Sequence, residues 1–555
     1  MNPAIFYHPD GYQTSGPKLM GRHAAGKSFL RAFLEQADND TFFCLAESEA
    51  HAAMFAEAVR DAGRSEPVVR LAGLSMGRFA EAGLLYFPAP TLAPLARQRS
   101  LFGHGAWSIC GVTHTLVSES AMDAVTEMLA APVQPWDALI CTSKSGRSVV
   151  ENLLRGQAEY LKARLGATRI VTPQLPVIPL GLHSADFDFS EADRAAARAV
   201  IGAGPDDVVV LFMGRLSFQA KAHPLAMYQA LQAARQSAKG EVILVECGIH
   251  SSEKSRQAFE AAARMGCPAI RTIHLDGRDA DAPRHAWAGA DVFCSLSDNL
   301  QETFGLTPIE AMAAGLPVVV TDWDGYRETV RHGIDGFRVG TTMPARDPVG
   351  DIAARHALLQ DSYDLMCAKT AMQVSVDVVQ AAQAFARLFA DPQLRRTMGE
   401  AGRAHARATY DWSVVMPQYK ALWAELGHIR ATEAPKLPDA AQGWPARPDP
   451  FRTFAAWPTL RTTGATRFAL NGEPAHIRAG YANLRKLTLV DFPGAQLPPE
   501  SDVALVIEAL ANGPLSAGEI AVLLPAPSQR TVLRLMGHLA KLAVVRALPP
   551  QQAGA

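Results

Sequence analysis

Residues 292–322, reading VFCSLSDNLQETFGLTPIEAMAAGLPVVVTD, constrain the fold more than any other stretch of this chain. Short apolar runs of strand length open and close it, at Val292–Leu296 and Pro317–Val320, and polar residues, Gly and Pro bound both runs. Between them the sequence predicts one short helix, with Thr307 as its N-cap and Glu310 at the capping-box position three residues later. The stretch therefore predicts a strand, a helix and a second strand in close succession.

The loop before this helix predicts a binding place for a diphosphate. It directs backbone N–H groups and the positive end of the helix dipole to one point, and Gly305 lets an anion approach closely. Glu302 and Glu310 flank this point, where the first could accept hydrogen bonds from sugar hydroxyls and the second from a ribose. Spacing alone also allows a structural interpretation, in which Glu310 completes the capping box and Glu302 is a solvated loop residue.

These residues resemble the E-x7-E signature of retaining glycosyltransferases of family 4, which have the GT-B fold. The stretch matches that signature at Glu302, Phe304, Gly305, Glu310, Ala311, Met312, Gly315 and Pro317. The resemblance implies a nucleotide-diphosphate sugar as donor, and it implies that the donor is bound by Glu302, Phe304, Gly305, Leu306, Thr307 and Glu310.

The N-terminal part of the chain predicts an α/β domain, because strand-like and helix-like runs alternate from Ala4–Tyr7 to Val177–Leu180. Residues 21–28 fit the Walker A pattern, but a loop precedes them where a P-loop needs a buried strand, so we interpret them as a glycine-rich loop that opens the first helix. In the family that the chain resembles, such a loop faces the cleft between two domains. The candidates for contact with the donor phosphate or the acceptor are therefore Gly21, Arg22 and Gly26.

Three further polar residues follow predicted strands. His114 lies just past a strand end, where ligands bind in open α/β sheets, although a loop histidine that caps the next helix explains the position as well. Arg215 and Lys221 follow Val208–Met213 and could neutralise a departing diphosphate, with a solvated basic loop as the alternative. By resemblance, His114 contacts the donor sugar or its leaving group, and the two cations match a GR…K signature in which Ala222 replaces the usual Gly.

The pattern divides the chain into four parts. Residues 1–182 form a Rossmann-like acceptor-side domain, and residues 183–428 a Rossmann-like donor domain with closing helices, the two facing a cleft. Residues 429–500 are a linker and an irregular region, and residues 501–555 are a small, mainly helical, winged-helix-like module. Its last helix carries four basic residues and no acid, Arg530, Arg534, His538 and Lys541. Because the domain charge is modest and no basic arm is visible, this favours a protein partner over nucleic acid.

Composition narrows the class of protein. The seven cysteines are scattered, lack any C-x-x-C pair and lie mostly inside apolar runs, so we expect buried free thiols in a reducing compartment, without a disulfide framework or a zinc site. The start of the chain lacks a basic and apolar leader, and no run of about 18 apolar residues appears. We therefore expect no transmembrane segment and a cytoplasmic location, with peripheral contact to the inner membrane as an alternative.

These observations predict a retaining hexosyltransferase that moves a sugar from a nucleotide-diphosphate sugar to an unidentified acceptor in bacterial-type glycan or glycoconjugate synthesis. The expected catalytic residues are His114, Arg215, Lys221 and Glu302, and neither a metal nor another cofactor is expected. Two alternatives stay open. One is a GT-B sugar-nucleotide epimerase, and the other is a scaffold that senses a nucleotide sugar while its C-terminal module binds a partner or DNA.

Overall fold

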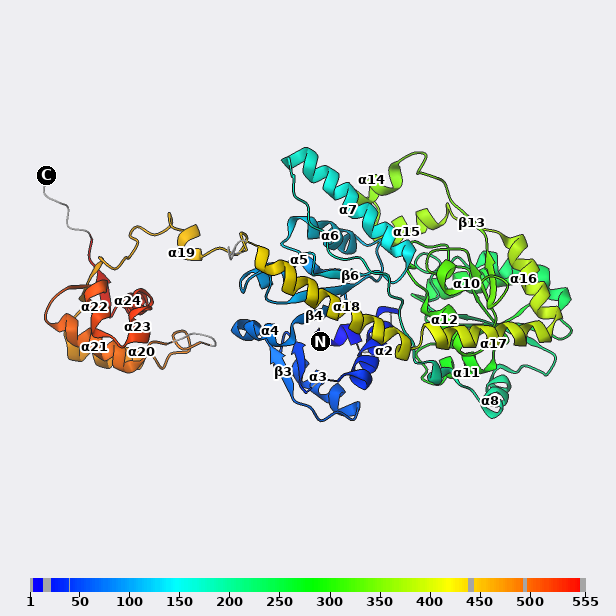
Figure 1. Cartoon of the computed structure of the whole chain (residues 1–555), viewed down its shortest axis with the longest axis horizontal. Helices are drawn as coiled ribbons and strands as arrows, with labels where there is room; N and C mark the ends of the chain where they lie inside the picture. The colour runs from blue at the N-terminus through cyan, green and yellow to red at the C-terminus, as the bar shows by residue number, and fades with distance from the viewer. Residues whose placement is uncertain (1–2, 13–20, 39, 438–443, 493–496, 550–555) are drawn as a thin grey trace. The chain divides into compact units, whose positions relative to one another are not determined.

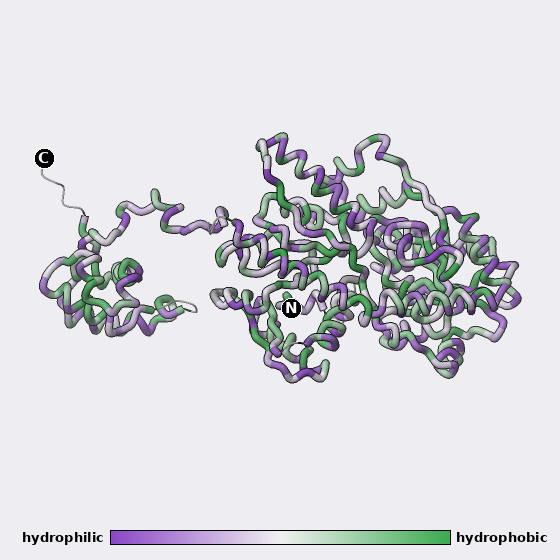
Figure 2. The backbone as a smooth tube through the Cα atoms, viewed as in Figure 1, coloured by the Kyte–Doolittle hydropathy of each residue, from purple (hydrophilic) through white to green (hydrophobic). Residues whose placement is uncertain are grey.

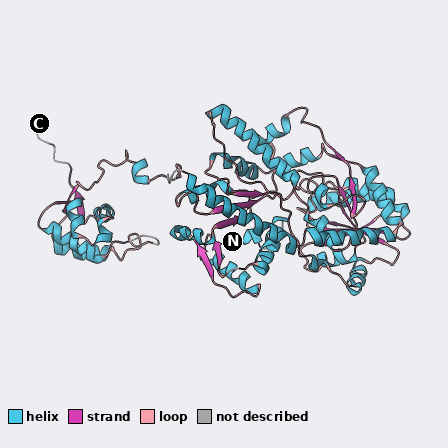
Figure 3. Ribbon diagram, viewed as in Figure 1, coloured by secondary structure: helices cyan, strands magenta, loops and turns pink. Residues whose placement is uncertain are grey.

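The chain folds into two compact units, Met1–Trp444 and Pro445–Ala555. The computed structural model describes residues 3–12, 21–38, 40–437, 444–492 and 497–549 (Figure 1). In both halves of the first unit, helices surround a central group of strands (Figure 3). Among the described residues, no helix combines the length and the apolar character that a membrane crossing needs.

The N-terminal half of the first unit contains a six-stranded parallel sheet, with the strand order β3-β2-β1-β4-β5-β6. Its strands are β1 (Ala4–Phe6), β2 (Phe42–Leu45), β3 (Val68–Leu71), β4 (Leu84–Phe87), β5 (Ser108–Val112) and β6 (Ala138–Ile140). The helices between and after them are α1 (Pro9–Tyr12), α2 (Gly21–Gln36), α3 (Glu49–Asp61), α4 (Phe79–Ala82), α5 (Leu92–Ser100), α6 (Glu119–Glu127) and α7 (Lys144–Leu165).

The second half repeats this plan with a six-stranded parallel sheet of order β12-β11-β10-β7-β8-β9. Its strands are β7 (Val208–Met213), β8 (Val242–Gly248), β9 (Arg271–Asp276), β10 (Val292–Ser295), β11 (Val318–Thr321) and β12 (Gly336–Val339). Its helices are α8 (Glu191–Ile201), α9 (Leu225–Ala234), α10 (Glu253–Gly266), α11 (Ala282–Gly289), α12 (Leu306–Ala313) and α13 (Tyr326–Thr329). After β12 come β13 (Thr341–Thr342), α14 (Asp351–Ala357), α15 (Tyr363–Ala371), β14 (Ser375–Val376), α16 (Val378–Ala390), α17 (Pro392–Thr409) and α18 (Trp412–Glu433).

The two parallel sheets confirm the α/β class and the two Rossmann-like halves of the GT-B architecture. Strands of a parallel sheet that is covered on both faces read as continuous apolar runs, and every residue of β8 is buried. Figure 2 shows hydrophobic residues concentrated along the strands, while outer helices such as α7 alternate in hydropathy. All seven cysteines are buried and unpaired, as the sequence predicts.

Helix α18 joins the two halves by returning to the N-terminal core. Trp412, Tyr419 and Trp423 are buried there, and Trp412 and Tyr419 pack against the ring of Phe29. The Trp412 indole N–H donates to Ser28 Oγ at 2.7 Å. These aromatic contacts make one core of the first sheet and the last helix of the unit.

The C-terminal unit has its own small core around a three-stranded antiparallel sheet, β16-β15-β17. Its elements are α19 (Pro450–Thr453), β15 (Arg467–Leu470), α20 (Pro474–Leu484), α21 (Glu500–Ala511), β16 (Leu515–Ser516), α22 (Ala517–Leu523), α23 (Ala526–Gln529), α24 (Val532–Lys541) and β17 (Val545–Ala547). Ser516 and Glu519 form a capping box at the start of α22, since Ser516 Oγ accepts from Glu519 N–H at 3.2 Å and Ser516 N–H donates to Glu519 Oε2 at 2.7 Å.

This unit differs from a winged helix in the origin of its third strand. The partner of β17 is β15, which precedes the helices, and among the described residues no strand follows β17 to form a wing hairpin. Strand β15 and helix α20 come from residues in which the sequence shows no clear pattern, yet Phe468 and Tyr481 are part of the core. Short elements of this kind depend on tertiary packing more than on local propensity.

Candidate functional site

Helix α12 begins two residues before its predicted start, since its N-cap is residue 305 and not residue 307. Its N-cap is Gly305, which adopts a left-handed conformation with φ of 91°, and a Cβ there would lie 2.1 Å from the ring of Tyr326. The predicted N-cap Thr307 is therefore wrong, because the turn at Gly305 starts the helix earlier. Thr307 lies in the first turn, and among the described residues its hydroxyl is buried without a hydrogen-bond partner. Glu310 lies beyond the capping-box position, so it does not close a capping box.

An ion pair between Lys221 and Glu302 lies beside this helix start. Lys221 Nζ donates to Glu302 Oε2, the Tyr326 hydroxyl donates to the same oxygen at 3.3 Å, and Thr303 N–H donates to Glu302 Oε1 at 3.3 Å. The side chain of Glu302 is only 9% exposed. Burial by itself raises the pKa of Glu302, but the charge and hydrogen bond of Lys221 outweigh it and hold this pKa below its ordinary value. Glu302 is thus a buried carboxylate that stays ionised at neutral pH.

Glu310 has the opposite electrostatic character. It is half-buried on α12, and burial raises its pKa to about 7, although the positive charge of Lys221 opposes the rise. Lys221 therefore acts on both carboxylates that the sequence predicts for the site. Lys221 bonds directly to Glu302, whereas the pKa of Glu310 stays at about 7.

Two loops are bound together around Lys221. Asn299 Nδ2 donates to the carbonyl of Gln219 at 2.8 Å, and Ser297 Oγ donates to the carbonyl of Lys221 at 3.2 Å. Arg215 belongs to the same loop as Lys221, and its guanidinium donates to the carbonyl of Ala220 at 3.4 Å. The loop after β7 and the loop after β10 thus bring together the cations and the carboxylate that the sequence predicts separately.

Phe304 and Leu306, two other residues predicted to contact the donor, differ in how deeply they are buried. Phe304 is buried in the core against Tyr410, with ring centroids 6.1 Å apart, so its side chain supports the loop from below. Leu306 is half-buried as the first residue of α12. The backbone of Gly305 and the hydroxyl of Thr307 are therefore the better candidates for direct contact with a ligand.

Asp324 is a residue of this site that the sequence analysis missed. It is a non-glycine residue with a left-handed backbone, φ 46°, and among the described residues its Oδ2 is buried without a hydrogen-bond partner. Burial and then the charge of Glu302 raise the pKa of Asp324 to about 8, so it is mainly protonated at neutral pH. The neighbouring Gly325 packs so closely that a Cβ there would lie 2.5 Å from the backbone of Phe304. The Asp-Gly dipeptide after β11 is the sequence signal that could have found this turn.

The N-terminal half reaches the same site through the start of α7. Ser143 Oγ donates to the carbonyl of Thr303 at 2.7 Å, directly beside Glu302. The backbone N–H groups of Lys144 and Ser145 donate to Glu328 Oε1 at 2.7 Å and 3.3 Å. A carboxylate at a helix N-terminus is stabilised by the unpaired N–H groups and the helix dipole. The two halves are thus held together next to the predicted catalytic residues.

His114 and the predicted glycine-rich loop lie on the N-terminal side. His114 is half-buried and follows β5, the strand next to β6, so it shares a sheet edge with Ser143. Residues 21–26 are helical, which corrects the predicted loop, because α2 already begins at Gly21. A Cβ on Gly26 would lie 2.0 Å from the carbonyl oxygen of Gly11, so this glycine serves close packing of α1 and α2. The surroundings of Gly21 and the side chain of Arg22 are outside what the structure describes.

Comparisons with known proteins match the second half of the first unit. Residues 193–346 match the family model described as "Glycosyl transferases group 1". The D-inositol 3-phosphate glycosyltransferase of Geodermatophilus obscurus is 34% identical over 192 residues, which cover 33% of this chain and 40% of that protein. An uncharacterized glycosyltransferase of Methanocaldococcus jannaschii is 28% identical over 179 residues, covering 31% of this chain and 43% of the relative. The chain thus spans about two fifths of the curated relatives that it matches.

Solved structures align with most of the first unit at low sequence identity. Anabaena HepE in complex with UDP aligns with a TM-score of 0.49 and 16% identity, covering 77% of this chain and 100% of that one. The sucrose-phosphate synthase of Thermosynechococcus elongatus aligns with a TM-score of 0.47 and 19% identity, covering 77% and 99%. The sequence similarity to group 1 glycosyl transferases therefore lies in the half of the molecule that carries Arg215, Lys221, Glu302 and Glu310.

Proposed function

We propose that this chain is a retaining glycosyltransferase that takes a sugar from a nucleotide-diphosphate sugar. The observation that carries the proposal is the Lys221–Glu302 ion pair beside the start of α12. The first N–H groups of a helix have no partner within the helix, and the buried Thr307 hydroxyl adds a polar group there. A cation, a helix start and an ionised carboxylate at one place suit a sugar diphosphate, which has anionic phosphates at one end and hydroxyls at the other.

In the proposed reaction the diphosphate lies at the start of α12. Lys221 and Arg215 balance the negative charge that grows on the diphosphate as its bond to the sugar breaks. Glu302, kept ionised by Lys221, accepts hydrogen bonds from sugar hydroxyls and fixes the position of the sugar. An acceptor oxygen forms the new bond to the same sugar carbon, and its proton leaves with the diphosphate. His114 completes the sugar pocket from the acceptor side, and Glu310 accepts from the ribose.

The proposed transfer needs no metal at the diphosphate, because two cationic side chains in one loop already supply positive charge there. This arrangement differs from a pair of carboxylates that act on water, as in glycosidases. The two halves of the first unit must meet for the sugar pocket to be complete, and contacts of Ser143 and Glu328 join them. The relatives named for inositol phosphate transfer support glycosyl transfer in general, and the acceptor of this chain is not assigned from them.

The proposal is tested with a panel of UDP-, GDP- and ADP-glucose and the Lys221→Ala variant. We expect one donor to release its nucleoside diphosphate slowly in water, and we expect Lys221→Ala to reduce that rate by about 100- to 1000-fold, the usual cost of losing one charge-stabilising donor. Lys239→Ala, which removes an exposed lysine of the same half, is the matched control and should leave the rate unchanged.

The alternatives predict different products. An epimerase would convert the sugar nucleotide into its epimer without releasing the nucleoside diphosphate. A scaffold would bind the sugar nucleotide, seen as a rise in melting temperature, with neither release nor conversion. Equal release rates in wild type and Lys221→Ala would contradict the proposed role of this lysine.

We also propose that the C-terminal unit binds an acidic amphipathic segment of a protein partner. A groove of about 1300 Å³ in this unit is lined by the aromatic residues Phe451, Phe454 and Trp457 and by the cations Arg461 and Arg534. The side chains of Phe451 and Trp457 are 76% and 80% exposed. Exposed aromatic rings beside cations fit a partner with apolar and acidic residues.

The same groove supports a protein partner over nucleic acid. Arg534 and His538, two of the three basic residues of α24, line the groove beside the aromatic rings. Arg530, which the sequence predicts in the same helix, precedes α24 as the C-cap residue of α23. Titration with an acidic amphipathic peptide should shift the emission of Trp457 to shorter wavelength, and Trp457→Phe should remove the shift. A basic peptide with the same apolar pattern should give none, and a stronger response to duplex DNA than to the acidic peptide would contradict this proposal.

A further inference from the structure

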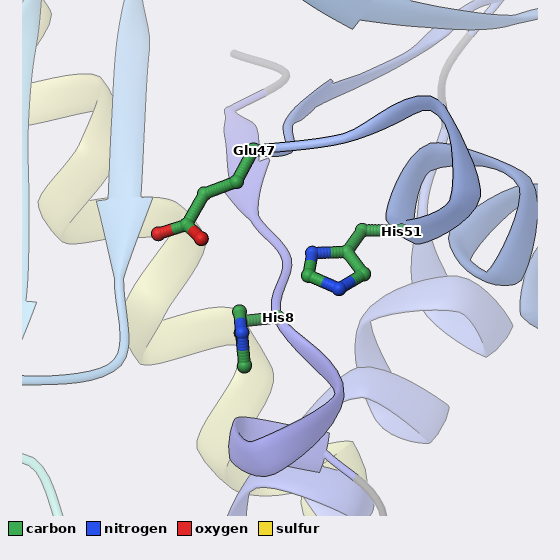
Figure 4. A group of neighbouring side chains, drawn as sticks. All are labelled: His8, Glu47 and His51. Carbon is green, nitrogen blue, oxygen red and sulfur yellow. The ribbon is translucent and has the colours of Figure 1, made fainter.

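Three side chains with metal-binding atoms meet at the edge of the first sheet (Figure 4). His8 follows β1, Glu47 follows β2, and His51 lies in the first turn of α3. One nitrogen from each histidine and one carboxylate oxygen of Glu47 lie within 4.8 Å of one another. Figure 4 shows the carboxylate and the two rings gathered around one space. Two imidazoles and a carboxylate are a common ligand set for zinc-type divalent ions.

Among the described residues, His51 Nδ1 and the Glu47 carboxylate have no partner, whereas His8 Nδ1 accepts from Asp10 N–H at 3.3 Å. His51 Nδ1 is buried without a hydrogen-bond partner, which is unfavourable for a polar ring nitrogen. The ring centroids of His8 and His51 are 4.7 Å apart, and the two rings meet edge to face. The Glu47 carboxylate forms no hydrogen bond or ion pair with the described residues, although the nearby Glu49 pairs with Arg70. A shared cation would satisfy all three groups.

The backbone that carries these side chains is fixed by contacts outside the cluster. The Arg70 guanidinium donates to the carbonyls of Ala46 and Glu47, at 3.2 Å each, which holds the loop after β2. Ser48 Oγ accepts from the N–H of His51 at 3.1 Å and caps α3. Such contacts orient ligands before a metal binds, which reduces the cost of forming the site.

His8 is positioned in a similar way. Tyr7 N–H donates to the carbonyl of Leu45 at 2.9 Å, which ties the end of β1 to the end of β2. Asp10 N–H donates to His8 Nδ1 at 3.3 Å, and the Asp10 carboxylate lies 3.8 Å from the same nitrogen. A hydrogen bond at one nitrogen of an imidazole orients the ring so that its other nitrogen can coordinate a metal. The sheet pairing and Asp10 thus support a ligand role for His8.

We propose that His8, Glu47 and His51 form a binding site for one zinc-type divalent metal ion on the acceptor side of the molecule. Three protein ligands leave at least one coordination position open for an oxygen of water or of the acceptor. All strands of a parallel sheet end at the same edge, and His114 follows β5, two strand positions from β1. At a strand spacing near 4.8 Å, the metal lies roughly 10 Å along this edge from His114. The metal site does not depend on the transferase proposal, and only its contact with the acceptor does.

The test uses the full chain without an affinity tag, freed of metal and titrated with Co²⁺ and then with Zn²⁺. Wild type should bind one Co²⁺ with visible absorption of a four- or five-coordinate ion, and Zn²⁺ should displace it. Losing an outer partner of a metal ligand typically costs about 10- to 100-fold in affinity, so removal of a ligand in Glu47→Gln or His51→Gln should cost at least ~100-fold.

Glu47→Gln is the decisive variant, because its exposed side chain makes no contact that folding needs among the described residues. His428→Gln removes an exposed histidine of α18 and should keep wild-type affinity. No visible Co²⁺ absorption in wild type, or unchanged affinity in both Glu47→Gln and His51→Gln, would overturn the proposal. Nucleotide-sugar binding by Glu47→Gln should stay at the wild-type value, which separates failure of the metal site from failure of the donor site.

Discussion

The two α/β halves share one plan of sheet and helices, but they assemble their polar sites in different ways. In the second half, Lys221 and Glu302 come from loops after neighbouring strands, β7 and β10, and form a direct ion pair. In the first half, His8, Glu47 and His51 gather at the ends of β1 and β2 without a direct bond between them. One site is already neutralised by its own residues, whereas in the other the Glu47 carboxylate and His51 Nδ1 have no partner among the described residues.

This difference indicates two kinds of ligand. An internally paired site keeps its carboxylate ionised and its lysine in place before the ligand arrives, which suits a substrate that itself carries anions and hydroxyls. A site in which an imidazole nitrogen and a carboxylate lack partners is satisfied by an added cation. We therefore propose that the corresponding edges of the two sheets bind different ligands, a sugar diphosphate in the second half and a metal ion in the first.

The largest expected effect is the loss of stability when the ion pair between Lys221 and Glu302 is broken. Lys221→Met leaves Glu302 buried without its cation, and loss of one partner of a buried pair costs about 3–5 kcal/mol, with less here because Lys221 is 20% exposed. The double variant Lys221→Met with Glu302→Gln should recover most of this stability without recovering activity. Urea unfolding measures the first effect and nucleotide release the second.

The double variant also tests whether the stability loss of Lys221→Met comes from the buried, unpaired carboxylate. If it is as unstable as Lys221→Met alone, the cost does not come from the uncompensated carboxylate. A matching pair of changes in the first half, Glu47→Gln with His51→Gln, should change the free energy of unfolding little in the absence of metal, because that site has no internal ion pair to break.

The second prediction concerns the turn that starts α12. Gly305→Ala should destabilise the fold by about 3 kcal/mol, because it combines a left-handed backbone with a Cβ 2.1 Å from the Tyr326 ring. Gly333→Ala is the matched control, with φ of 78° and open space around the new Cβ, and should cost about 1 kcal/mol. Equal losses in the two variants, measured by thermal unfolding, would show that contact with Tyr326 contributes nothing.

The sequence singles out the residues that meet beside α12 because its signals there are local. Strand, loop and helix follow one another in 292–322, and the cations follow a strong apolar run, so Glu302, Arg215 and Lys221 are found as separate candidates. The bond between Lys221 and Glu302 could not be predicted, since it depends on which strands are neighbours. The start of α12 was mispredicted because Gly305 packs against Tyr326, a contact from 21 positions later (305 to 326).

The cluster of His8, Glu47 and His51 gives no sequence signal at all. His8 and Glu47 are 39 positions apart (8 to 47), and only the parallel pairing of β1 with β2 brings them together. The helical start of α2 was also missed, since a segment with two glycines reads as a loop until its packing against α1 is known. In the C-terminal unit, β15 is too short for periodicity to reveal it.

The third prediction concerns a substitution that weakens the contact between the two halves of the first unit. Glu328→Gln removes the charge that the start of α7 binds, and a carboxylate at a helix N-terminus contributes about 0.3–2 kcal/mol. We expect kcat/KM for glycosyl transfer to fall by up to about 10-fold, because each 1.4 kcal/mol is tenfold. Glu159→Gln, an exposed glutamate of the same helix α7, should have no effect on kcat/KM. A larger loss in Glu159→Gln than in Glu328→Gln would contradict the role of the contact.

The smallest expected effect is a pH dependence with opposite signs for stability and for donor binding. Burial raises the pKa of Glu310 and of Glu246, a buried residue of β8, to about 7 each. A carboxyl with a raised folded-state pKa stabilises the fold at low pH, and this contribution is lost as pH rises through about 7. Donor binding that uses ionised Glu310 should instead strengthen over the same range, by a few-fold between pH 6 and 8.

Two matched variants separate these effects. Glu310→Gln should flatten the pH dependence of donor binding, measured by calorimetry with the nucleoside diphosphate. Glu246→Gln should leave that dependence unchanged, because Glu246 accepts from Tyr228 at 2.6 Å inside the core and is not part of the proposed donor site. Both variants should reduce the fall in stability of the ligand-free protein between pH 6 and 8. If Glu246→Gln alters the pH profile of binding as strongly as Glu310→Gln does, the profile reports the stability of the second half and not an ionised group at the ribose.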